Sequence, residues 1–183
     1  MKISLFVYLS LISLSFAQDH GHALGAHEHG FLKVEMAVEK SSAEIEIDGP
    51  AESFLGFEYA PKTKEEVKIF QSVQNKWTKN FESLFKFDKS LQCQLESATL
   101  ELEQDNHREK NSDKKQKSSK KVKGVHSDVK AQAKVTCSSN LSGSLLTVYL
   151  KKEFKNIKKI NLTILGSETK SVEIKDEVFK TKI

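Results

Sequence analysis

Apolar and polar residues alternate strictly in several stretches of the chain, and a period of two is typical of strands with one buried face. The apolar residues of the first stretch are Leu32, Val34, Met36 and Val38. Residues 43–47 repeat the pattern after a short polar segment that can turn the chain. The spacing therefore predicts an antiparallel hairpin near the start of the fold.

The second half of the chain predicts another antiparallel pair. Its first strand changes parity between Leu95 and Leu100, which predicts a β-bulge at Ala98 and Thr99. The apolar residues of the partner strand are Val125, Val129, Ala131, Ala133, Val135 and Cys137. Pairing Leu95 with Val135 and Leu100 with Ala131 also places Glu96 near Lys134 and Glu101 near Lys130, so opposite charges face each other.

One helix and three further strands complete the expected fold. Thr63 and Glu66 form a capping-box pattern. A stripe of apolar residues follows it at helical spacing: Val67, Phe70, Val73, Trp77, Phe81 and Leu84. Residues 51–61 are interpreted as a loop. Strands are predicted at 144–150, 160–165 and 169–174, the last two joined by a two-residue turn at Gly166 and Ser167. The expected class is α+β, mainly antiparallel, with one or two helices.

The length of 183 residues suits a single domain, placed at 31–183. Residues 1–17 have one early lysine, an apolar stretch and small residues at Ser15 and Ala17, which is typical of a cleavable secretory signal. The apolar stretch is shorter than the roughly 20 residues that span a bilayer, so no stable membrane anchor is expected. The mature protein would begin with a histidine-rich segment, 18–30.

Export also bears on the two cysteines. Thiols that mature in an oxidising compartment pair unless a metal takes them, whereas cytosolic thiols stay reduced. We therefore expect a disulfide between Cys93 and Cys137, and the register above follows if the two cysteines face each other.

A lysine-rich segment, 104–124, connects the two strands of the second pair as a long hairpin loop expected to be disordered. Residues 105–124 hold eight basic and three acidic side chains and almost no apolar ones, too few to form a core. Nucleic-acid binding is not expected, because the segment has no aromatic residues for stacking. The alternative to a solvated loop is a basic arm that docks on an acidic partner.

Histidines are the strongest chemical signal. Four of the six lie within ten positions: His20, His22, His27 and His29. Neutral imidazole is a common ligand of zinc and copper, and a dense group on a glycine-containing segment predicts metal binding. The alternative is a polar tail without a ligand.

His126 and Asp128 form a second candidate pair, since residues two apart share one face of a strand. With His27 and His29 they would supply three imidazoles and a carboxylate, a ligand set suited to tetrahedral zinc. Ordinary surface residues are the alternative interpretation. If cleavage leaves Gln18 first, its amine and His20 would also form an array suited to Cu²⁺ or Ni²⁺.

Catalytic motifs are missing from the sequence: it has no G-x-S-x-G, no phosphate-binding glycine loop and no H-E-x-x-H. We therefore expect a protein that is not an enzyme. A metallohydrolase built on His27, His29, His126 and Asp128 is the catalytic alternative, and it would require a structured pocket.

Three motifs occur in a distinctive order: G-A-H-E-H-G at 25–30, G-F-E-Y-A-P at 56–61, and H-S-D-V at 126–129 between the two cysteines. In these motifs and their spacing the chain resembles the ZrgA family of bacterial zinc-uptake proteins. The resemblance implies a periplasmic accessory protein that captures Zn²⁺ and aids its delivery to a membrane transporter, with the N-terminal histidines and the hairpin loop as zinc contacts.

The hairpin loop departs from the family pattern. The family commonly fills it with His, Asp and Glu, whereas here it is rich in lysine and contributes only His107. Ammonium groups repel Zn²⁺, so the resemblance carries zinc binding to His20, His22, His27, His29, His126 and Asp128 but not to the loop as a whole. A structural or interaction module that docks through the basic loop is the alternative function.

Overall fold

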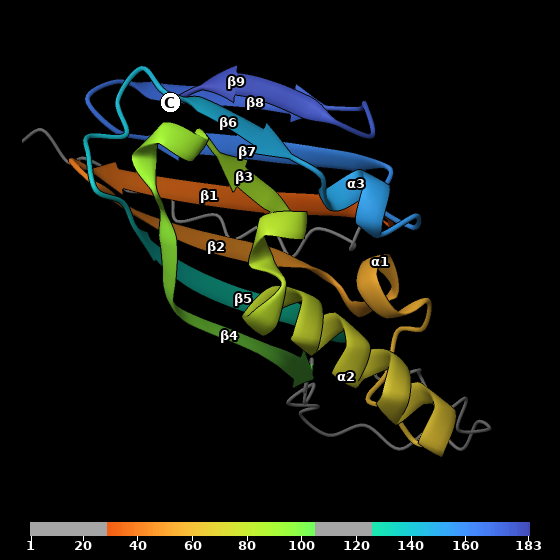
Figure 1. Ribbon diagram of the computed structural model, residues 1–183. Coiled ribbons are helices and arrows are strands. Elements are labelled where there is room, and N and C mark those ends of the chain that lie inside the picture. Colours follow the sequence, from red (N-terminus) through yellow and green to blue (C-terminus); the bar gives the residue numbers. More distant parts are fainter. Residues whose placement is uncertain (1–28, 105–125) are drawn as a thin grey trace, which may run out of the picture.

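The computed structural model describes residues 29–104 and 126–183 (Figure 1). The predicted signal segment 1–17, the histidines at 20, 22 and 27, and loop residues 105–124 lie outside the described residues. Within the described ranges, no helix combines the length and apolar character needed to cross a bilayer.

A six-stranded sheet forms the centre of the molecule, and its strand order is β4-β5-β2-β1-β7-β8. Its strands are β1 (Phe31–Glu39), β2 (Ser42–Pro50), β4 (Gln94–Gln104), β5 (Ser127–Thr136), β7 (Lys159–Leu165) and β8 (Thr169–Ile174). All neighbouring pairs are antiparallel except β1 and β7, which run parallel. The expected class, α+β with a mainly antiparallel sheet, is confirmed.

A smaller sheet and the helices pack on one face of the large sheet (Figure 1). The small sheet contains β3 (Phe85–Phe87), β6 (Leu145–Val148) and β9 (Phe179–Lys182), in the order β3-β6-β9. The α-helices are α1 (Ala51–Leu55), α2 (Lys64–Lys79) and α3 (Leu150–Glu153), and the 3₁₀ turns are η1 (Phe81–Ser83) and η2 (Lys89–Leu91). The apolar faces of these elements form one core, in keeping with a single fold.

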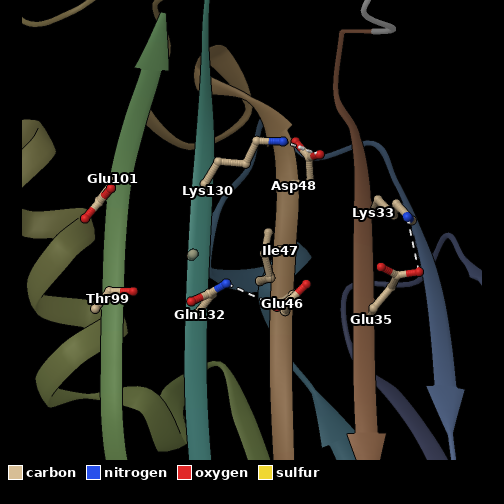
Figure 2. Close-up of a pocket in the computed structure, with 10 residues that line it drawn as sticks. Lys33, Glu35, Glu46, Ile47, Asp48, Thr99, Glu101, Lys130 and Gln132 are labelled. Carbon is tan, nitrogen blue, oxygen red and sulfur yellow. Dashed lines mark hydrogen bonds and ion pairs between the residues drawn. The ribbon is translucent and has the colours of Figure 1, made fainter. Parts of the chain in front are cut away.

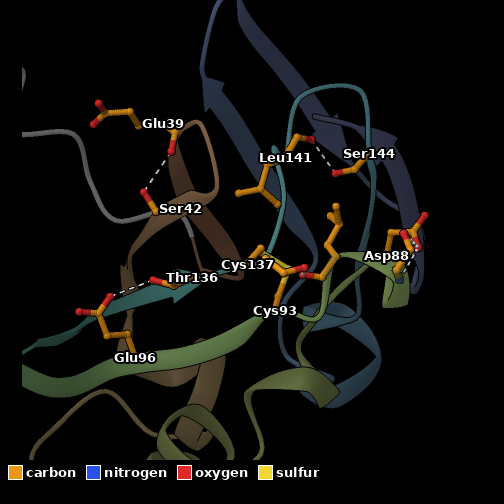
Figure 3. Close-up of a disulfide and its surroundings, with 12 residues drawn as sticks. Glu39, Ser42, Asp88, Cys93, Glu96, Thr136, Cys137, Leu141 and Ser144 are labelled. Carbon is orange, nitrogen blue, oxygen red and sulfur yellow. Dashed lines mark hydrogen bonds between the residues drawn. A yellow bond between two sulfur atoms is a disulfide. The ribbon is translucent and has the colours of Figure 1, made fainter.

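The predicted register of β4 and β5 is confirmed: Leu95 pairs with Val135, and Leu100 with Ala131. The predicted bulge position is wrong, because the register shifts between Leu95 and Ser97. Glu96 is therefore the extra residue, and its carboxylate accepts a hydrogen bond of 3.0 Å from Thr136 Oγ1 (Figure 3). After this one extra residue, the side chains of β4 again alternate between the two faces of the sheet.

The predicted disulfide joins Cys93 to Cys137 (Figure 3). Beside it, the Ser138 amide donates to the Leu91 carbonyl oxygen at 2.8 Å. The covalent bond therefore closes the end of the β4–β5 pair that is opposite the connecting segment 105–125.

Helix α2 begins as predicted, since Thr63 and Glu66 form a complete capping box. Its second half is buried through Val73 and Trp77, and the Trp77 indole N–H donates to the Gln132 carbonyl oxygen at 2.9 Å. The predicted stripe fails at its ends: Val67 is 40% exposed, because the first half of α2 extends past the sheet, and Phe81 belongs to η1 (Figure 1). Phe81 still packs in the core, edge-to-face against Trp77.

Three sequence-based boundaries need correction. The segment interpreted as the loop 51–61 begins with helix α1, and β2 continues through Gly49 and Pro50 rather than ending before them. Gly49 permits this, because a Cβ atom there would lie 2.6 Å from Leu32 Cδ1. The β7–β8 turn has three residues, 166–168, since Leu165 pairs with Thr169. Strands β3 and β9 were not predicted; at three and four residues they are too short to give a clear period of two.

Candidate metal centre

Four potential ligands meet at the end of the large sheet where β1 and β5 begin and β2 ends. His29 lies just before β1, and His126 just before β5. Glu52 belongs to α1, which follows β2 directly, and Glu58 belongs to the segment between α1 and α2. Residues that are far apart in the sequence are thus brought together by the strand order β5-β2-β1.

Glu58 lies between the two histidines. Its Oε1 is 3.1 Å from His29 Nδ1, and its Oε2 is 2.7 Å from His126 Nδ1. His29 Nδ1 is also within hydrogen-bonding distance of the Glu52 carboxylate. The ligand atoms of His29, Glu52 and Glu58 all lie within 4.8 Å of one another, a spacing that allows one metal ion to contact all three.

The backbone at Gly30 fixes His29 at the edge of the sheet. Gly30 has φ +81°, and a Cβ atom there would lie 2.8 Å from the Asn156 carbonyl oxygen. Its own carbonyl oxygen accepts hydrogen bonds from the Lys158 and Lys159 amides at 2.8 and 3.1 Å. The last glycine of the G-A-H-E-H-G motif is therefore needed for two reasons: its φ is positive, and the Asn156 carbonyl oxygen leaves no room for a Cβ atom.

Helix α1 holds Glu52 by its backbone. Gly56 ends the helix at φ +82°, and its amide donates to the Glu52 carbonyl oxygen at 2.9 Å. The Asn156 side-chain amide donates to the same oxygen at 3.1 Å. These bonds fix the Glu52 backbone and leave its carboxylate to face His29.

The backbone also links Glu58 to the strand that carries His126. The Ser127 amide donates to the Glu58 carbonyl oxygen at 2.7 Å. Because Ser127 follows His126 directly, this bond brings the second imidazole to the Glu58 carboxylate. A backbone contact thus pairs two side chains from distant parts of the chain.

The group is open to solvent and has the chemistry of a zinc site. The side chains of His29 and His126 are each 53% exposed, and those of Glu52 and Glu58 are 38% and 35% exposed. Imidazole nitrogens and carboxylate oxygens are both ligands of Zn²⁺, and two carboxylates attract a dication. Partial exposure gives an ion a direct path in and out.

The structure unites part of the predicted ligand set. It brings His29 and His126 to one carboxylate, whereas Asp128 lies on the polar face of β5 with Lys130. Burial lowers the pKa of the Lys130 ammonium, but the carboxylates of Asp48, Glu103 and Asp128 outweigh that effect and raise it. His20, His22 and His27 lie outside the described residues.

Sequence reasoning missed Glu52 and Glu58 as candidate ligands. Glu58 lies inside the G-F-E-Y-A-P motif, so the motif contained a signal for it. Glu52 gave none, because the five-residue helix α1 is too short to show a period and the segment was interpreted as a loop.

A hollow of about 290 Å³ lies on the polar face of the large sheet (Figure 2). Its lining pairs acidic with basic or amide side chains: Lys130 with Asp48, Gln132 with Glu46 at 3.1 Å, and Lys33 with Glu35 at 3.1 Å. Ammonium groups next to the carboxylates disfavour a divalent cation there. The histidine–glutamate group is therefore the better candidate for a metal.

Fold and site together define an α+β protein that carries an exposed histidine–glutamate group at one end of its main sheet. Residues 26–179 match the family model described as ZrgA family zinc uptake protein. Since the match covers most of the chain, the protein belongs to this family, as its motifs predicted. A search of curated proteins found no match.

Proposed function

We propose that this protein captures Zn²⁺ in the periplasm and passes it on for uptake, without catalysing a reaction. The observation that carries the proposal is the position of Glu58 between His29 and His126, with Glu52 beside His29. His29, Glu52 and Glu58 hold their ligand atoms within 4.8 Å of one another, so one zinc ion could contact all three, and His126 adds an imidazole on the second oxygen of Glu58. The ion is the cargo in this proposal, and its release would complete the task.

The proposed periplasmic location and the proposed role in zinc uptake rest on separate observations. Residues 1–17 have the pattern of a secretory signal, and membership of a zinc-uptake family favours a role next to a membrane transporter. The histidines at 20, 22 and 27 precede His29 in the sequence and would add exposed ligands for capture. Exposed ligands favour exchange of the ion over permanent storage.

Calorimetric titration of Zn²⁺ into the metal-free mature chain tests the proposal. We expect Glu58→Gln to lower the zinc affinity of the structured site by at least about 10-fold, because it removes a charged ligand shared by two histidines. Glu35→Gln is the matched control: it removes a half-exposed carboxylate paired with Lys33 on the polar sheet face and should leave zinc binding unchanged.

A second comparison separates the structured site from the N-terminal histidines. A variant with His20→Ala, His22→Ala and His27→Ala should bind fewer zinc ions per protein molecule. It should keep the binding step of the structured site, which is the step that Glu58→Gln weakens. Zinc binding should also weaken from pH 7.5 to 5.5, because imidazole must be neutral to bind a metal. If wild-type protein dialysed against chelator takes up no zinc, or if Glu58→Gln binds as wild type does, the proposal is wrong.

A further inference from the structure

The segment 56–63 carries Glu58 across the surface between α1 and α2, outside any helix or strand. A metal site built on such a segment needs something to hold the ligand in place. The Ser127 amide holds the backbone of Glu58 from one side. The contacts on the other side converge on one carboxylate, that of Glu66 in α2.

Glu66 accepts three hydrogen bonds from this segment. Tyr59 Oη donates to Oε1 at 2.8 Å, and the amides of Lys62 and Thr63 donate to Oε2 at 2.8 and 2.9 Å. A helix N-cap needs only the bond from Thr63, so the other two bonds exceed what capping requires. Their effect is to tie both the side chain next to Glu58 and the end of the segment to the rigid first turn of α2.

Tyr59 is held by more than its hydroxyl group. Its ring lies 5.3 Å from the Phe57 ring, centre to centre, and the Lys62 ammonium lies 4.6 Å from its centre. Phe57 and Tyr59 flank Glu58 in the sequence, so fixing both rings limits the directions that the Glu58 carboxylate can take. The hydrogen bond to Glu66 gives this arrangement a fixed point on α2.

We propose that Glu66 is a positioning residue for the metal site: through Tyr59 and the backbone of residues 62–63 it holds Glu58 between His29 and His126. The inference rests on the proposed function for its link to zinc. It extends the site to a residue that acts on the four candidate ligands only through other residues. It also explains what the tyrosine of the G-F-E-Y-A-P motif does in this chain.

Thr63 offers a control that separates positioning from capping. Thr63→Ala removes the bond from the Glu66 amide to Thr63 Oγ1, 3.2 Å, and so weakens the helix cap. It leaves all three bonds to the Glu66 carboxylate in place. Tyr59→Phe disturbs the link to the segment and leaves the capping box intact, whereas Glu66→Gln disturbs both the link and one half of the box.

The experiment has two readouts on the full mature chain. In the metal-free protein, hydrogen exchange of the Ser127 amide reports whether Glu58 is held; Glu66→Gln and Tyr59→Phe should accelerate it, and Thr63→Ala should not. In competition with a chromogenic chelator, Glu66→Gln should lower zinc affinity by about 10- to 100-fold, the range typical of groups that orient metal ligands. Tyr59→Phe should give a smaller loss, and Thr63→Ala should retain wild-type affinity.

The outcomes can be told apart. Unchanged Ser127 exchange in Glu66→Gln and Tyr59→Phe would overturn the positioning role, whether or not the protein binds zinc. Equal losses of zinc affinity in Glu66→Gln and Thr63→Ala would also overturn it, since helix stability alone would then explain the effect. Accelerated exchange in a protein that binds no zinc would uphold the link from Glu66 to Glu58 and refute the proposed function.

Discussion

At the scale of single residues, glycines decide where the candidate ligands lie. Gly30 and Gly56 both have positive φ, and each stands next to or near a ligand, His29 in one case and Glu58 in the other. A side chain at either position would favour another backbone conformation and move the ligand. The candidate metal centre thus depends on residues that offer no ligand atoms.

Replacing Gly30 with Ala should destabilise the protein and displace His29. Gly30 and Gly143 have nearly the same φ, +81° and +79°, but a Cβ atom at Gly30 would lie 2.8 Å from the Asn156 carbonyl oxygen, whereas at Gly143 nothing lies within 4 Å. We expect Gly143→Ala to cost about 1–2 kcal/mol from backbone conformation alone. Gly30→Ala should cost more than Gly143→Ala in urea unfolding and should lower zinc affinity as well. Equal costs would contradict the steric argument.

The candidate site was only partly predictable at this scale. His29 and His126 stood out because imidazole is scarce and chemically distinctive, and both lie in the site. Glu52 and Glu58 did not, because glutamate is common on surfaces and only the folded chain shows which carboxylates face a histidine.

At the scale of elements, the reliable predictions were those with a repeated pattern. The alternation in β1, β2 and β5 continues over nine or ten residues, so these strands could be derived before the fold was known. The register of β5 against β4 could be derived too, whereas the pairing of β5 with β2 and of β1 with β7 was not predicted. The capping box of α2 was equally clear. Helix α1 and strands β3 and β9 could not be derived, since packing against the rest of the molecule stabilises such short elements more than their own sequence does.

The helix cap of α2 should give the protein an acid-sensitive component of stability. The Lys62 and Thr63 amides, followed by the Tyr59 hydroxyl, lower the pKa of Glu66 from 4.5 to about 2. A carboxyl group with a lowered pKa in the folded state stabilises the fold above its unfolded pKa, and that contribution is lost as the pH falls through the folded value. The difference in melting temperature between wild type and Glu66→Gln should therefore be largest above pH 5, shrink as the pH falls toward 2 and vanish only below pH 2. A constant difference across this range would contradict the assignment.

At the scale of the whole molecule, the disulfide and the candidate metal centre lie at opposite ends of β5. The disulfide joins Cys93 to Cys137 just after the strand ends, and the candidate ligand His126 precedes its first residue. The two features should therefore act independently, one on stability and one on binding.

Removing both cysteines tests this independence. A Cys93→Ala, Cys137→Ala variant should lose about 2–4 kcal/mol of unfolding free energy, because the disulfide closes a long loop in the unfolded chain. Its zinc affinity at 25 °C should match that of wild type. The measurements are urea unfolding under non-reducing conditions and calorimetric titration; a fall in affinity would show that the two ends of β5 are coupled.

The parallel pairing of β1 with β7 joins residues from the first and last thirds of the chain in the middle of the sheet. Until β7 is in place, β1 has no partner on that side, so the large sheet cannot be completed without the last third of the chain.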